Sequence, residues 1–378
     1  MHFVNNVVSA DTGNVFFTSF LTLPRYVWRS PDFGCTNESD DAASAYLQSL
    51  LWCITGQEQY ADHAIAVLNA YAYGLDEYNN SNAPLQAGWS LMQFSKAAEL
   101  LTHGRGLQAS RYDEKDRAAL VEMLHRTTVP LIIDGSGANG NWELSMLDGL
   151  IGLAVFSDNT TLFQHTIDLW KQRLPAYFYV EALDGSFPQP APRGNITWYG
   201  QEVFNASIDG HCQETCRWLQ PTQMGFASAI NCAYTAGLQG VDLLGDADTQ
   251  LRLTSAMEYH AAYLLNHSVP AFVCPDEVGV GNLTIDPTFE VAYHAYHRQR
   301  NVSLPLTAQH IQAHVRSQVR LVQSLEFHCA HVWRTLAGVR ACVRVCVAHM
   351  LFCQADPAKN IIFVYETLSH GGPLQQTQ

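Results

Sequence analysis

Apolar residues in this chain recur every three or four positions over most of its length, and this spacing predicts helices rather than strands. Asp40 and Asp41 are expected to cap the first helix, and Thr55-Gly56 to end it. The expected buried side of that helix consists of Ala43, Tyr46, Leu47, Leu50, Leu51 and Ile54. A second helix follows, whose expected buried side consists of Ala61, Ala64, Ile65, Leu68 and Ala72. The two helices together predict an αα-hairpin.

Further helices are predicted at 90–103, 113–126, 142–156, 160–174, 222–238 and 247–265, with loops rich in Gly, Pro and Asn between them. No stretch alternates for long between apolar and polar residues, although residues 176–183 can form a short strand. We therefore expect an all-α fold in which successive helical hairpins form an incomplete (α/α) toroid. The inner ends of the helices and their connecting loops would then line a groove.

The composition excludes several classes of protein. The chain has 378 residues, of which 47% are apolar and 15% charged, as in globular proteins. It contains no apolar run near the roughly 20 residues that a membrane-spanning helix needs. A formal net charge of -14 argues against a nucleic-acid partner. Any polyanionic ligand must therefore be held by a local group of cationic and amide side chains. We expect a monomer that binds neither membranes nor nucleic acid.

The asparagines point to a compartment. Asn-X-Ser/Thr sequons begin at Asn37, Asn79, Asn159, Asn195, Asn205, Asn266, Asn282 and Asn301, against roughly two expected by chance. This excess favours a secreted, extracellular glycoprotein (periplasmic if the source is bacterial), and an accident of composition is the alternative. The ten cysteines are compatible with disulfides in that setting. The first residues lack the features of a signal peptide, so we expect that the natural start is missing from this sequence.

The chain is expected to have four parts. Residues 1–32 are irregular and are interpreted as a truncated or misassigned start, and residues 33–316 form the main helical domain. Residues 317–355 contain four of the ten cysteines, four arginines, Glu326 as their single acid, and no sequon. We interpret the segment 317–358 as an atypical insert, either an amphipathic helix or a translated intron, and favour the intron. Residues 359–378 return to the character of the main domain.

Four polar clusters lie at predicted helix starts and loops. Their candidate site residues are Asn82, Gln86 and Trp89; Asn141 and Trp142; Arg217 and Gln223; and Tyr293, His294, Tyr296 and His297.

Each cluster also has a plainer interpretation. Asn141 can cap a helix that begins at Trp142, and the tryptophans can be packing residues. Arg217 can form a surface ion pair with Glu214, which contributes little. The histidines of 294–297 can form a solvated helix face. Because they have no obvious third ligand, we expect no metal site.

Taken together, the clusters fit the cleavage of a uronic acid polymer. Asn, Gln and Arg can neutralise a carboxylate, Trp can stack on a sugar ring, and Tyr or His can move a proton. The C5 proton of a uronate is only weakly acidic, so donors around the carboxylate would stabilise the enolate-like intermediate while O4 departs. The product is an unsaturated uronide. No Asp/Glu pair is prominent in the clusters, which weighs against hydrolysis by two carboxylates.

The motifs also resemble a known family. In chain order they read NSNAPLQAGW, NGNWELSMLDGLIGLAVF, DGHCQETCRWLQPTQMGFASAINCAYTAGLQGVDL, AMEYHAAYLLN and PTFEVAYHAYH. Together they resemble the alginate lyase superfamily, above all its secreted fungal and bacterial members, over residues 33–316 and again at 365–371. The resemblance implies an (α/α) toroid and β-elimination on alginate, glucuronan or a related polyuronate, with no cofactor.

The resemblance also assigns roles. It places Asn141 and Arg217 where they neutralise the carboxylate, and it gives proton transfer to Tyr293 or, second, Tyr296. The remaining candidates contact the substrate: Asn82, Gln86, Trp89, Trp142, Gln223, His294 and His297.

One stretch departs from the family pattern. Relatives read R-D-L-x-H-T-Q where this chain runs from Arg217 to Gln223, so Trp218 replaces an aspartate and Pro221 a histidine. Histidine can accept a proton or neutralise a carboxylate, whereas proline can do neither. We expect Pro221 at the first position of a helix, where its missing N–H is not needed. Three interpretations stay open: a working lyase, a weakened or inactive homologue that binds acidic glycan, and a hydrolase on the same fold.

Overall fold

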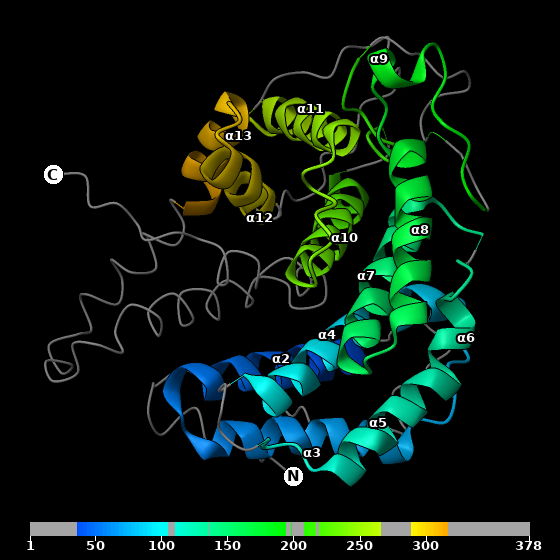
Figure 1. Cartoon of the computed structure of the whole chain (residues 1–378), viewed down its shortest axis with the longest axis vertical. Helices are drawn as coiled ribbons and strands as arrows, with labels where there is room; N and C mark the ends of the chain where they lie inside the picture. Colours follow the sequence, from blue (N-terminus) through cyan, green and yellow to red (C-terminus); the bar gives the residue numbers. More distant parts are fainter. Residues whose placement is uncertain are drawn as a thin grey trace, which may run out of the picture. The chain divides into compact units, whose positions relative to one another are not determined.

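The computed structural model describes residues 36–104, 110–135, 137–193, 198, 208–216, 219–265 and 289–316 (Figure 1). These residues are mainly helical and contain no strand, which confirms the predicted all-α class. The helices are α2 (Thr36–Thr55), α3 (Glu58–Gly74), α4 (Ala83–His103), α5 (Glu114–Thr127), α6 (Val129–Ile132), α7 (Gly140–Phe156), α8 (Thr160–Tyr177), α9 (Glu181–Asp184), α10 (Leu219–Leu238), α11 (Ala247–Leu264), α12 (Phe289–Tyr293) and α13 (Pro305–His310). Two π-helical segments, η2 (His294–Arg298) and η3 (Ile311–Arg316), continue α12 and α13. The predicted start 1–32, insert 317–358 and last part 359–378 lie outside the described residues.

The described residues fall into two compact units. The first contains the described residues up to 135 together with Met146–His165, and the second contains Gly137–Ser145 and the described residues from Thr166 onward. Helices α7 and α8 contribute residues to both units. The arrangement of the helical hairpins as a toroid stays a prediction. No helix of the described part combines the length and the apolar character needed to cross a membrane.

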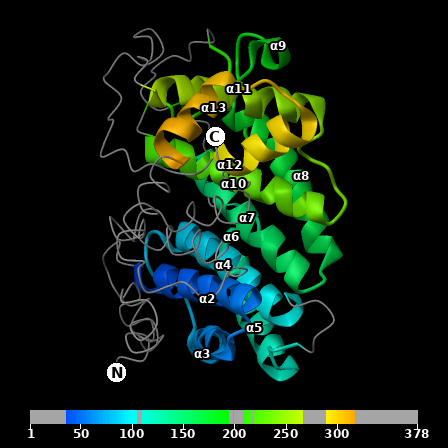
Figure 2. The same ribbon diagram turned by 90° about the vertical axis from the view of Figure 1, so that its left-hand side faces the viewer.

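In the first unit, α2 packs against both α3 and α4, and α3 packs against α5. Figure 2 shows α2 and α4 side by side. The predicted hairpin is therefore confirmed as α2 and α3. Tyr71 of α3 meets Phe94 of α4 with the ring centroids 5.0 Å apart. Helix α5 begins where the side chain of Asp113 accepts the N–H of Lys115 at 2.9 Å, a capping bond that satisfies a donor of the first turn.

The prediction that Asp40 and Asp41 cap α2 was wrong. The helix begins at Thr36, so Asp40 and Asp41 lie inside it and do not cap it. Asp41 is buried instead and accepts the Tyr71 hydroxyl at 2.7 Å.

The buried face of α2 is also rotated from the prediction. The side chains of Leu47 and Leu50 are half-buried, whereas Gln48 and Ser49 are buried. These two polar groups can be buried because they bond within the unit, Gln48 to Ser44 at 3.0 Å and Ser49 to the Ala45 carbonyl at 2.8 Å.

In the second unit, α10 packs against α12, and α11 packs against α13. Edge-to-face aromatic contacts run through its core, with Phe226 of α10 4.8 Å from Phe289 of α12 between ring centroids. The strand predicted at 176–183 was wrong. Helix α8 continues to Tyr177, and only Phe178 forms a bridge, with Cys212, before α9 begins at Glu181. One short pairing with 211–213 replaces a strand.

Candidate active site

The first turn of α7 carries Asn141. Its side chain is 1% exposed, and among the described residues no group forms a hydrogen bond with its Oδ1. The capping interpretation was wrong because α7 begins at Gly140, two residues before the predicted start at Trp142. The carbonyl of Asn139 accepts the N–H groups of Trp142 and Glu143 at 3.1 and 3.3 Å. A buried amide group without a partner is costly. Asn141 can therefore bind a ligand without breaking an internal hydrogen bond of its Oδ1.

The segment 208–216 holds the start of α7 in place. The Gln213 side-chain oxygen accepts the N–H of Gly140 at 3.2 Å, and Asn139 donates to Glu214 at 3.1 Å. A Cβ on Gly140 would collide with Tyr177 and with Gln213, so a larger residue would displace this contact. Glu214 is fully buried, so an ion pair with it would not lie at the surface; its predicted partner Arg217 lies outside the described residues.

A buried ion pair fixes the same turn from the other side. Arg173 of α8 donates through Nε to Glu143, and through Nη2 to the Arg193 carbonyl at 2.7 Å. Arg173 and Glu143 are 1% and 3% exposed. Burial raises the pKa of Glu143, and the positive charge of Arg173 opposes this rise. A carboxylate near a helix N-terminus is also favoured by the helix dipole. The pair therefore holds the turn that carries Asn141.

Pro221 lies in the first turn of α10. Its position is third rather than first in the helix, because α10 begins at Leu219. The N–H groups of the first turn have no intrahelical partner, so proline breaks no hydrogen bond there either. The hydroxyl of Tyr177 donates to the Pro221 carbonyl at 3.4 Å. The pyrrolidine ring offers no group that can take up a proton, and Arg217 lies outside the described residues.

A buried group of Cys212, Thr215 and His260 lies beside α10, where the Cys212 thiol is 3.8 Å from the Thr222 hydroxyl, and the sequence alone did not predict it. The Nδ1 of His260 faces the Ala256 carbonyl at 2.8 Å. A carbonyl only accepts, so Nδ1 carries the proton, and Nε2 accepts the Thr215 hydroxyl at 3.1 Å. Burial lowers the pKa of His260 to about 4 and raises that of the Cys212 thiol. Because these three side chains are buried and neutral, they are suited to stabilising the fold rather than to catalysis.

The tyrosines and histidines of 293–297 lie where α12 changes into η2. Tyr293 stacks on His297 with ring centroids 4.7 Å apart, and it is 9% exposed. The Nδ1 of His297 faces the Val302 carbonyl at 2.9 Å and so carries the proton, which leaves a lone pair on Nε2 in the neutral ring. Tyr296 is fully buried, and burial raises its pKa. Both histidines are half-buried, so they are not a solvated face.

Contacts within the second unit link these elements. Ser145 of α7 lies 3.1 Å from Ser228 of α10, hydroxyl to hydroxyl, and α10 meets α12 through Phe226 and Phe289. These contacts join the elements that carry five predicted residues: Asn141 and Trp142 on α7, Gln223 on α10, Tyr293 on α12 and His297 on η2, which continues α12.

The first unit holds the other predicted residues. Asn82 precedes α4, is half-buried, and makes no capping bond with its side chain. Trp89 is half-buried. Gln86 is 1% exposed, and both ends of its carboxamide are bonded: Nε2 donates to Glu38, and Oε1 accepts from Asn80 at 2.9 Å. The polar atoms of Gln86 are therefore engaged inside the protein, and substrate binding by Gln86 stays a prediction.

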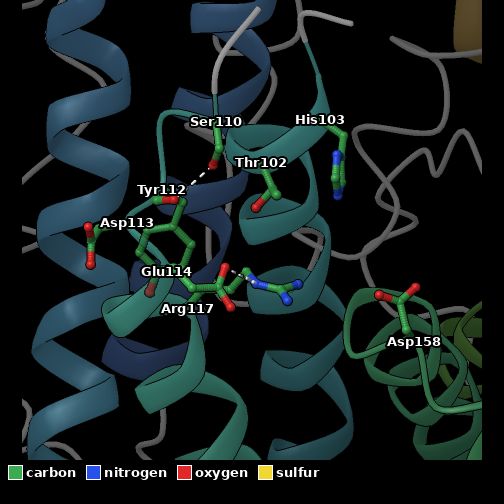
Figure 3. Close-up of a pocket in the computed structure, with 8 residues that line it drawn as sticks. All are labelled: Thr102, His103, Ser110, Tyr112, Asp113, Glu114, Arg117 and Asp158. Carbon is green, nitrogen blue, oxygen red and sulfur yellow. Dashed lines mark hydrogen bonds and ion pairs between the residues drawn. The ribbon is translucent and has the colours of Figure 1, made fainter. Parts of the chain in front are cut away.

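The first unit also has a pocket of about 430 Å³ (Figure 3). Its lining contains none of the predicted residues and is formed by Thr102, His103, Ser110, Tyr112, Asp113, Glu114, Arg117 and Asp158. The single guanidinium, that of Arg117, is bonded to Glu114 at 3.2 Å. Three carboxylates in the lining make this pocket unsuitable for a polyanion. Within the described ranges, no group of His, Cys, Asp and Glu side chains could hold a metal ion.

The fold and these groups define a helical protein whose second unit contains the buried side chains of Asn141, Arg173 and Tyr293. A model of the alginate lyase family matches residues 35–269, and this chain belongs to that family. The match covers the described site residues of both units up to α11, and ends before Tyr293. A search among curated proteins found no match.

Proposed function

We propose that the protein is a polysaccharide lyase that cleaves an acidic polyuronate, of the alginate or glucuronan type, by β-elimination. Membership of the alginate lyase family supports the class of reaction. The observation that carries the proposal is the buried side chain of Asn141, whose Oδ1 has no partner among the described residues. Rotation of the amide by half a turn brings Nδ2 to the same place, so Asn141 can donate to a carboxylate.

In this proposal the residues divide the work of one elimination. Asn141 and Arg217 neutralise the uronate carboxylate, which makes the C5 proton more acidic. A base removes that proton, its electron pair forms the C4=C5 double bond, and the C4–O4 bond breaks with protonation of O4. Tyr293 is the proposed base. Tyr296 fits this role less well, because burial raises the pKa of its phenol and so keeps the hydroxyl protonated.

The remaining predicted residues are proposed to contact the polymer. Trp142, Gln223, His294 and His297 belong to the second unit, and Asn82 and Trp89 to the first. His297 is a second candidate for proton transfer because its neutral ring keeps a lone pair on Nε2.

Pro221 favours one alternative, a weakened or inactive homologue that binds acidic glycan. In the family pattern a histidine stands at this position of α10, and the proline ring cannot replace its proton chemistry. The backbone tolerates proline there, so the fold survives the change while a reacting group is lost.

We further propose that the protein is secreted and glycosylated. Asn79 and Asn301, which begin two of the sequons, are exposed. Cys216 is disulfide-bonded, a state typical of oxidising compartments.

An ultraviolet assay for the unsaturated uronide tests the proposal. The native protein, Pro221→His, Tyr293→Phe and the matched control Tyr296→Phe would be given glucuronan, polymannuronate, polyguluronate and hyaluronan. A lyase gives rising absorbance with at least one polymer, and this signal is lost in Tyr293→Phe but kept in Tyr296→Phe. Signal from Pro221→His at least about tenfold above native indicates a weakened enzyme. Silence from both folded proteins contradicts the lyase and leaves the glycan-binding alternative.

A further inference from the structure

The carboxyl group of Glu38 is fully buried in the first unit, and it faces the segment 80–89. Its Oε1 accepts the hydroxyl of Tyr78 at 2.6 Å, and its Oε2 accepts the side-chain amide of Gln86. Both partners lie at least 40 positions away along the chain. The sequence around Glu38 contains no motif that predicts these two contacts.

The hydrogen bonds around Glu38 form a series from Asn82 through Asn80 and Gln86 to Glu38, and the donor and acceptor roles in this series are fixed from the Asn82 end. The backbone N–H of Asn82 can only donate, and it points at Asn80 Oδ1 at 2.9 Å. Asn80 must therefore turn its Nδ2 toward Gln86, whose Oε1 accepts it at 2.9 Å. Gln86 is then left with Nε2 facing Glu38. As long as this series of hydrogen bonds is complete, Glu38 Oε2 must act as an acceptor.

This series of hydrogen bonds lies beside Asn82, which precedes α4, and Trp89 of α4, the two residues of the segment that are proposed to contact the substrate. Asn82, Gln86 and Trp89 are four and seven positions apart, so they share one face of the helix. Gln86 is the buried member of that face, and Asn82 and Trp89 are half-buried. The Asn82 side chain makes no capping bond, although asparagine is among the best capping residues.

We propose that Glu38 is a positioning residue for this segment: through Gln86 and Asn80 it sets where Asn82 is presented to the polymer. The inference rests on the proposed function insofar as it names the polymer as ligand. The alternative is that Glu38 merely supports the core.

Glu38→Gln and Glu38→Met separate the two roles. In the glutamine variant, the new side chain can keep its oxygen toward Gln86 and offer its NH2 group to Tyr78, whose hydroxyl turns and accepts. The methionine side chain is of similar length but offers no comparable acceptor, so the chain of hydrogen bonds opens at this point.

The matched control is Asp41→Leu. Asp41 lies one turn further along α2 and is also buried. It accepts the hydroxyl of Tyr71 of α3, a residue outside the segment 80–89. A core defect should therefore appear in Asp41→Leu, while a positioning defect should appear in Glu38→Met alone.

The experiment combines hydrogen exchange of peptides spanning 78–90 with lyase kinetics on the polymer that the native protein cleaves. We expect roughly tenfold faster exchange at Asn82 in Glu38→Met, because the buried hydrogen bond that Gln86 donates to Glu38 is lost. We also expect KM to rise at least about fivefold with kcat kept within about twofold. Glu38→Gln should stay close to native in both measurements, and Asp41→Leu should leave exchange in this segment unchanged.

The proposal is overturned if Glu38→Met and Asp41→Leu change exchange alike, or if Glu38→Gln behaves like Glu38→Met. If Glu38→Met does not fold, Asn80→Ala opens the chain at its half-exposed end and must give the same exchange change and a raised KM. If the native protein cleaves no polymer, the exchange data and polymer affinity decide this inference on their own, and only the proposed function fails.

Discussion

Replacement of Arg173 with methionine tests the buried ion pair that holds the first turn of α7. Methionine keeps much of the apolar stem but removes the guanidinium, which donates to Glu143 and to the Arg193 carbonyl. Glu143 then keeps a buried carboxyl group without its charged partner. Loss of one partner of a buried pair costs about 3 to 5 kcal/mol of unfolding free energy, and both side chains are at most 3% exposed, so the full range applies.

The loss of unfolding free energy in Arg173→Met should increase as the pH rises. Burial already raises the pKa of Glu143 above its ordinary value of 4.5 with Arg173 present. Without Arg173 the pKa rises further, so the folded state binds a proton that the unfolded state has released. This contribution to stability is present at low pH and is lost as pH rises through the folded pKa. The destabilisation by Arg173→Met should therefore be larger at pH 8 than at pH 5.

Urea unfolding of Arg173→Met, Glu143→Leu and the double variant measures the effect. Each single variant should lose about 3 to 5 kcal/mol of unfolding free energy. The loss in the double variant should exceed the loss in either single variant by less than about 2 kcal/mol, because the apolar pair leaves no unpaired charge. Additive losses, or a single loss below about 1 kcal/mol, would refute the account of a desolvated pair. The Asn141 turn should loosen with the single variants, so lyase activity should fall more than stability alone explains.

Two further predictions concern the second unit. In Gly225→Ala the new Cβ would lie 2.6 Å from Cζ of the buried Tyr177 ring, so we expect the free energy of unfolding in urea to fall by about 1 to 3 kcal/mol. The control is Gly237→Ala on the same helix, whose new Cβ would have nothing within 4 Å and which should gain up to about 1 kcal/mol. Equal effects of the two substitutions would contradict this account of the packing. Burial lowers the pKa of His260 from 6.5 to about 4, so the unfolded state binds more protons between these pH values and stability should fall by up to about 3 kcal/mol as pH drops from 7 to 4. His260→Gln should flatten that fall in a pH series of thermal melts, and an unchanged slope would count against the neutral buried ring.

The sequence predicted the helices well where apolar spacing was regular. The hairpin of α2 and α3, and the helices later found as α5, α7, α8, α10 and α11, were placed to within a few residues. The π-helical turn after Tyr293 was not predicted, since no local pattern distinguishes it from an α-helix. The face of α2 was misplaced because polar side chains such as Gln48 bond to neighbours and become buried, which apolar periodicity cannot show.

The sequence predicted the candidate site less completely. Asn141 was placed at a helix start from its local context alone. The internal role of Gln86 could not be predicted, because its partner Glu38 lies 48 positions away and neither residue is apolar. The buried His260 and Cys212 were missed for the same reason, since their contacts join segments far apart in the chain. Long-range polar contacts leave no periodic signal in a single sequence.

The most direct test of the proposed function is the fate of water during cleavage. The native protein would act on the most reactive polyuronate in water labelled with heavy oxygen, and mass spectrometry would follow the released oligosaccharides. β-Elimination predicts products with a C4=C5 double bond, and labelled oxygen only to the extent that the reducing end of a pre-formed oligosaccharide exchanges in the same water. Products that carry the label and no double bond would contradict the account and identify a hydrolase.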